Sequence, residues 1–77
     1  MITIIKGKNV NYILMLDGKR VGEVWKMKYK SGFGVKIDGY YWLGNEPNQR
    51  GGSTAVKVRR LMDAAPLAMR VLTHNVI

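Results

Sequence analysis

The chain has 77 residues, with thirteen Lys/Arg, five Asp/Glu and no cysteine, so its formal net charge is +8 at pH 7. This length allows one domain and excludes a multi-domain enzyme or a doubly wound nucleotide-binding fold. The absence of cysteine excludes disulfides, thiolate metal sites and a thiol nucleophile. Apolar runs such as Tyr12–Leu16 are far shorter than the roughly 18 residues of a membrane span. We therefore expect a small, cytoplasmic domain without a signal peptide.

Residues 10–44 have the pattern of an antiparallel meander. Asn11–Leu16 is an expected strand, and the Asp17-Gly18 pair after it is typical of a hairpin turn, in which both central residues need positive φ. Residues 21–29 then alternate strictly, which predicts a strand with Trp25 on its core face and lysines on the other face. A second Asp-Gly pair separates the two remaining expected strands, Phe33–Ile37 and Tyr40–Leu43.

The second half of the chain has a different composition and predicts a loop and a helix. Residues 45–52 are rich in Gly and Asn and are expected to form a loop. Apolar residues recur at helical spacing over residues 54–65, and Pro66 disfavours helical geometry just before it, so a helix is expected to end there. Residues 66–77 are expected to form a tail, in which Leu67–Leu72 is compatible with either a further turn of helix or a packed segment. The expected fold is α+β, with a three- or four-stranded antiparallel sheet packed by one C-terminal helix.

The sequence contains no residue pattern typical of a catalytic site. The one histidine, His74, lies near the end of the chain, and two of the five acids, Asp17 and Asp38, belong to Asp-Gly turns. No pair of acids has the spacing of an acid/base or metal site. The stretch from Arg50 to Ser53 is Gly-rich but lacks the P-loop pattern. We expect no catalytic site, no cofactor and no metal.

The basic residues are more informative, because strand alternation puts Lys26, Lys28 and Lys30 on the face opposite the aromatics. A positive face that also holds an aromatic is typical of nucleic-acid binders. We expect the lysines to contact phosphates and Arg20 to be the best candidate for reading a guanine edge. A one-residue slip of the last strand would exchange Tyr41 with Trp42 on this face. The predicted contact residues are Arg20, Lys26, Lys28, Lys30, Lys36 and Tyr41.

Other interpretations of the same face stay open. Lysines on a solvent-facing sheet also prevent edge-to-edge pairing, although a net charge of +8 exceeds what solubility requires. Duplex DNA is the favoured ligand, and RNA is an alternative because a row of lysines does not identify the sugar. A second hypothesis is a phage or mobile-element protein that binds an acidic host protein through this face. Both a monomer and a homodimer are compatible with the sequence.

Two short stretches, Val24-Trp25-Lys26-Met27-Lys28-Tyr29 and Trp42-Leu43-Gly44-Asn45, resemble the ethylene-response-factor DNA-binding domain. The same region is similar to the arm-site-binding N-terminal domain of phage-type integrases. The resemblance implies a three-stranded sheet laid in the DNA major groove, with one helix that follows the Trp-Leu-Gly segment. Thr54-Ala55-Val56-Lys57 lacks the acids that begin the helix of the plant domain. Ile13–Leu16 stands in place of that domain's Arg-rich first strand, so base-reading arginines are not carried over.

Overall fold

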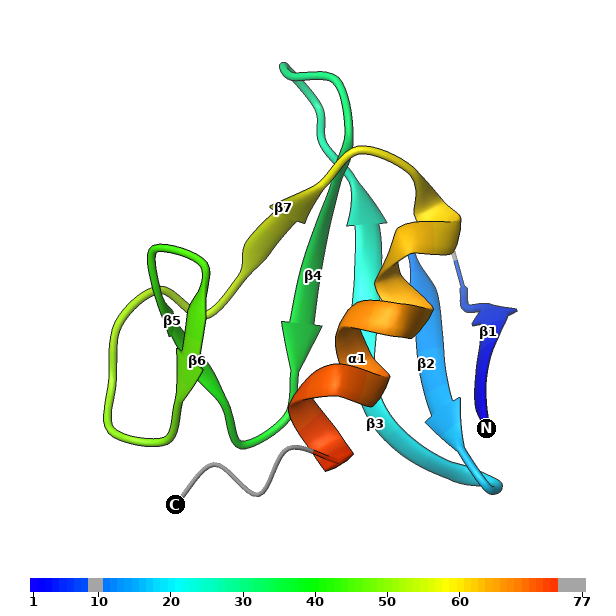
Figure 1. The fold of residues 1–77 in the computed structure, drawn as a ribbon. Coiled ribbons are helices and arrows are strands. Elements are labelled where there is room, and N and C mark those ends of the chain that lie inside the picture. The colour runs from blue at the N-terminus through cyan, green and yellow to red at the C-terminus, as the bar shows by residue number, and fades with distance from the viewer. Residues whose placement is uncertain (9–10, 74–77) are drawn as a thin grey trace.

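The computed structural model describes residues 1–8 and 11–73. The five strands of its main antiparallel sheet stand in the order β1-β2-β3-β4-β7, and β5 pairs with β6 in a separate hairpin. Helix α1 covers one face of the main sheet (Figure 1). The α+β class and the C-terminal helix are therefore confirmed, with five strands in the sheet. The elements are β1 (Ile2–Lys6), β2 (Tyr12–Leu16), β3 (Lys19–Lys26), β4 (Phe33–Ile37), β5 (Tyr41–Leu43), β6 (Glu46–Asn48), β7 (Val56–Val58), the 3-10 turn η1 (Leu61–Asp63) and α1 (Ala64–Thr73).

The β2–β3 hairpin forms where the sequence predicts it. Asp17 and Gly18 both have positive φ, 52° and 82°, as a tight hairpin turn requires. The alternating Ile2-Thr3-Ile4 segment adds β1 to the free edge of β2, with Ile4 opposite Leu14. This strand was not expected from the sequence, and it extends the sheet beyond the predicted meander.

The core lies between α1 and one face of the main sheet, called here the inner face. Val24 and Val35 are paired across β3 and β4 on this face, and both are fully buried. Ala64, Ala68 and Val71 of α1 pack in the same buried cluster, because small residues on the helix let its backbone approach the sheet.

The prediction that Trp25 lies in the core is wrong. Trp25 pairs with Gly34, so it points to the opposite, outer face of the sheet. Its indole packs on Gly34, where the missing side chain leaves room for the ring. Trp42, the other tryptophan, is buried, at 1% exposure, while Phe33 and Tyr40 pack at the margin of the core.

The predicted helix over residues 54–65 is also wrong. Val56-Lys57-Val58 forms β7, which pairs with the free edge of β4, and the helix begins only at Ala64. Pro66 lies in the first turn of α1, where a missing N–H costs nothing because the first backbone donors of a helix have no partner. Residues 66–73 of the expected tail are thus helical, and His74 lies outside the described residues. Within residues 1–8 and 11–73, no helix is long and apolar enough to cross a membrane.

The contact between Trp25 and Gly34 gives a test of the outer face. A Cβ on Gly34 would lie 2.5 Å from Cε2 of Trp25, so Gly34→Ala must displace the indole. We expect a loss of about 1–3 kcal/mol in the free energy of unfolding, measured by urea denaturation. Gly51→Ala is the matched control, because a Cβ there meets no atom within 4 Å. Equal stability of the two variants would contradict the packing of Trp25 on Gly34.

Candidate nucleic-acid interface

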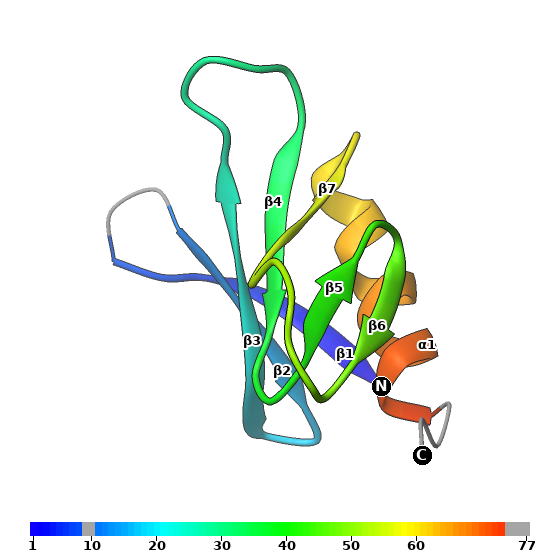
Figure 2. The ribbon, with the colours of Figure 1, turned by 90° about the vertical axis from the view of Figure 1, so that its left-hand side faces the viewer.

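The connection between β3 and β4 forms a projecting loop that carries two of the predicted lysines (Figure 2). Strand β3 ends at Lys26, and the backbone N–H of Met27 donates to the carbonyl oxygen of Gly32 at 3.2 Å, closing the loop. Lys28 and Lys30 are exposed within it. The strict alternation of residues 21–29 therefore does not correspond to one continuous strand.

The predicted row of lysines on one sheet face is wrong for a second reason. Lys26 pairs with Phe33 on the inner face of the sheet, whereas Lys36 lies on the outer face with Trp25 and Gly34. The prediction assumed that the large Trp25 marks the core side of β3. The small Gly22 and the branched Val24 mark it instead, since both are buried.

Strand β7 brings further cations to the same loop. Val58 pairs with Phe33, so the segment after β7 lies at the end of the sheet where the loop projects. The Cε atom of Lys57 lies 3.0 Å from the position of a Cβ on Gly32, which places the lysine stem against the loop. Gly32 has a φ of 103°, a conformation that L side chains rarely adopt. A shallow hollow opens here, lined by Ser31, Gly32, Lys57, Arg59, Arg60 and Asp63.

One ion pair in the hollow is well defined. The guanidinium of Arg60 donates to Asp63 from Nη2 at 3.1 Å and from Nε at 3.4 Å, and the backbone N–H of Arg60 donates to Oδ2 at 3.2 Å. Hydrogen bonds from Arg60 lower the pKa of the Asp63 carboxyl below its usual range. Asp63 is therefore charged at neutral pH and offsets part of the positive charge of the hollow.

The β1–β2 connection adds two more lysines at this end of the sheet. Lys6 pairs with Tyr12, which in turn pairs with Val24 near the end of β3, and Lys8 follows in the connection. We define the basic end as the eight Lys/Arg of these three segments. Together with Asp63 they carry a charge of +7, out of +8 for the whole chain. The basic end consists of Lys6, Lys8, Lys26, Lys28, Lys30, Lys57, Arg59 and Arg60.

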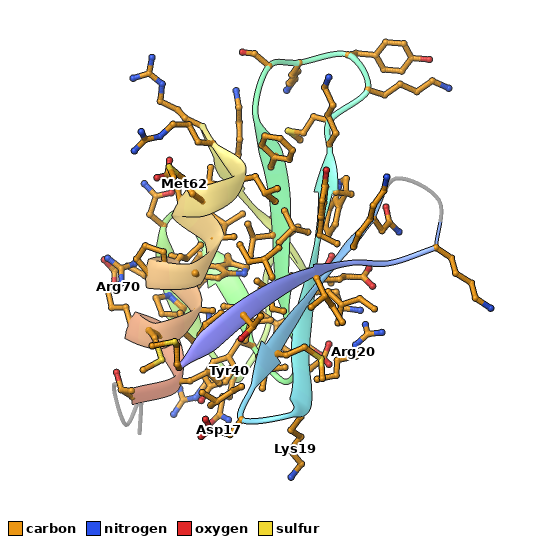
Figure 3. All side chains as sticks on the ribbon, turned by 90° about the vertical axis from the view of Figure 1, so that its right-hand side faces the viewer. Asp17, Lys19, Arg20, Tyr40, Met62 and Arg70 are labelled. Atoms are coloured by element: carbon orange, nitrogen blue, oxygen red, sulfur yellow. The ribbon has the colours of Figure 1, made fainter. Side chains whose placement is uncertain are left out.

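Arg20 lies at the opposite end of the sheet, beside Asp17 and Lys19 at the β2–β3 turn (Figure 3). Its guanidinium pairs with Glu23 at 3.0 Å and with Asp38 at 3.5 Å. The rise of about 3.3 Å per strand residue separates it from Lys26 by roughly 20 Å along β3. The structure therefore does not bring Arg20 together with the lysines of the basic end.

Tyr41 is not on the lysine face either. It lies on β5 in the separate hairpin and is 37% exposed, while its neighbour Trp42 points into the core. The register thus has Tyr41 exposed and Trp42 buried, as expected. The expected extension of the main sheet by this strand does not occur, because β7 occupies the edge of β4.

Sequence reasoning missed five residues of the basic end: Lys6, Lys8, Lys57, Arg59 and Arg60. Lys57, Arg59 and Arg60 fall within the helix expected over residues 54–65, and a helix there would not have paired with β4 beside the β3–β4 loop. The Val-Lys-Val alternation is the signal that could have identified a strand there, since valines at every second residue are typical of strands.

The basic end provides cations and exposed polar groups, and it is suited to binding a polyanion. In the part of the chain that the structure describes, no three metal-ligating side chains of His, Asp or Glu lie together.

The segment Trp42-Leu43-Gly44 leads into the β5–β6 hairpin and not into a helix. Comparison of the chain with family models, curated proteins and solved structures gave no match.

The ion pair in the hollow predicts a variant with higher affinity for polyanions. Asp63→Asn removes the one carboxylate of the hollow and leaves Arg60 without its ionic partner. We expect binding to an oligonucleotide to tighten by about 3-fold to 10-fold at low salt, because one more cation becomes available. Fluorescence anisotropy at pH 7 measures this change. Leu43→Asn, on the exposed hairpin, is the control and should leave the affinity unchanged.

Proposed function

We propose that this protein is a small, non-enzymatic nucleic-acid-binding protein of the cytoplasm, and that the phosphate backbone of its ligand lies along the basic end. The supporting observation is the segregation of charge, since this end carries +7 of the net +8. The cations come from two loops and from the segment that begins in β7, so they do not form a single row along one strand. Such a distribution can contact several successive phosphates.

The proposed contact surface is the basic end and not a flat face of the sheet. Lys26 and Lys36 lie on opposite faces of the sheet, so they cannot both contact a duplex laid along one face. The outer face also holds Glu23 opposite Lys36, which weakens its positive charge. Duplex DNA, RNA and single-stranded DNA all present the phosphates that the basic end would bind.

The test is a salt titration of affinity between about 50 mM and about 300 mM, with single-stranded and duplex oligonucleotides. If four to six phosphates are contacted, log K should fall with log salt at a slope of about −3 to −5. Poly-glutamate of matched charge is the control, since it presents carboxylates without nucleotides. Absence of binding at low salt would contradict the proposal. Equally tight binding of poly-glutamate would favour an acidic protein as the partner.

A further inference from the structure

The projecting β3–β4 loop carries an aromatic side chain with no packing role. Tyr29 is 88% exposed, more than any other aromatic residue of the described ranges. It lies between Lys28 and Lys30 in the sequence, within the loop that the Met27–Gly32 hydrogen bond closes. A single exposed aromatic is common on protein surfaces, but this one lies in the most positively charged part of the molecule.

The immediate surroundings of the Tyr29 ring are cationic. The Nζ atom of Lys28 lies 5.6 Å from the ring centroid, within the range of a cation–π contact. Tyr29 is not among the residues that form the core cluster or pack against it. The ring is therefore accessible to a flat ligand, with the Lys28 ammonium group beside it and Lys30 next to it in the sequence, both able to bind the phosphates that flank such a ligand.

We infer that the protein takes up a single-stranded segment of nucleic acid, with one unpaired base stacked on Tyr29 and the adjoining phosphates bound by Lys28, Lys30 and Lys57. This inference rests on the proposed function and names its ligand class. Aromatic side chains beside a basic groove are the common means of binding single strands, because every base has a π-face. Bases in a duplex are stacked on each other, so Tyr29 would reach only their edges or would have to unstack them.

The test compares three ligands with the same number of phosphates on the bound strand: oligo(dT), an abasic strand and a duplex. At equal salt, we expect the wild-type protein to bind oligo(dT) about 5-fold to 100-fold more tightly than the abasic strand. Tyr29→Ala should abolish this preference and leave affinity for the abasic strand unchanged. Tyr29→Phe, which retains the ring, is the matched control and should keep the preference. Because Tyr29 is exposed, both variants should keep the circular dichroism spectrum of the wild type.

The outcomes separate the two proposals. Failure of all three ligands to bind at low salt would overturn the proposed function. Binding of all three with equal affinity for oligo(dT) and the abasic strand would overturn the stacking inference alone. A preference for oligo(dT) that survives in Tyr29→Ala, or tighter binding of the duplex than of the single strand, would also overturn it while the proposed function stands.

Discussion

Replacement of Lys28, Lys30, Lys57 and Arg59 together by glutamine is expected to weaken oligonucleotide binding by about 100-fold or more at about 50 mM salt. All four side chains are exposed. Lys28 and Lys30 lie in the β3–β4 loop, and Lys57 and Arg59 line the adjoining hollow. Each lost phosphate contact reduces the salt slope by about 0.7 for a single strand, so the slope should become less negative by about 2 to 3. Fluorescence anisotropy across a salt series measures both quantities.

A second quadruple variant separates the position of the charges from their number. Substitution of four exposed cations outside the basic end by glutamine lowers the net charge by the same amount, from +8 to +4. We expect this variant to lose less than about 5-fold in affinity, since only the long-range field changes. Equal losses in the two variants would mean that net charge alone drives binding, and would contradict a defined interface at the basic end. The control residues are Lys19, Lys36, Arg50 and Arg70.

Trp42→Ala is expected to destabilise the protein by about 3–5 kcal/mol, the usual cost of truncating a buried tryptophan. Trp42 is 1% exposed and is the largest fully buried side chain in the described ranges. Its backbone N–H and carbonyl also pair with Ser53 at 2.8 and 2.9 Å, joining β5 to the segment that leads to β7. Small domains have little stability to lose, so the variant should be largely unfolded at 25 °C. Urea denaturation followed by circular dichroism measures the loss.

Two further variants define the cause of this loss. Leu43→Ala, at the neighbouring and 65% exposed position, should change stability by less than about 0.5 kcal/mol. Trp42→Phe should be milder than Trp42→Ala, because it keeps a ring in the core and because the indole Nε1 has no hydrogen-bond partner among the described residues. Similar losses in the Phe and Ala variants would show that the indole shape, and not apolar volume, stabilises this part of the core.

Local sequence signals predicted the central hairpin well. The Asp17-Gly18 turn, the strands on either side of it and strand β4 all form where turn chemistry and alternation place them. These signals are local, since a residue pair with positive φ specifies a turn whatever surrounds it. The burial of Trp42 could also be predicted, because a small domain needs its large side chains inside.

The faces of the sheet could not be predicted with the same success. Trp25 was placed in the core by size, but Gly34 on the neighbouring strand provides room for the indole on the outer face. That contact depends on the register between β3 and β4, which no pattern within β3 contains. The error moved Lys26 and Lys36 onto one face, and with them the predicted interface.

The helix error has a related cause. Residues 54–65 contain apolar spacing compatible with a helix, yet the free edge of β4 lies within reach and pairs with Val56–Val58. Tertiary pairing overrode local helical spacing, because a strand edge with open hydrogen-bonding groups stabilises an added strand. The consequence for the site is large, since the pairing of β7 brings Lys57 and Arg59 from the expected helix to the basic end.

The sequence by itself determined that this protein is a small α+β domain with a net charge of +8 and a tight central hairpin. Composition and turn residues are sufficient for those properties. Only the tertiary structure decided where the charge lies, because strand order and register join three segments distant in the sequence: the β1–β2 connection, the β3–β4 loop and the end of β7. Pairing between strands brings the cations of these segments to the same end of the sheet, where Tyr29 lies exposed in the β3–β4 loop.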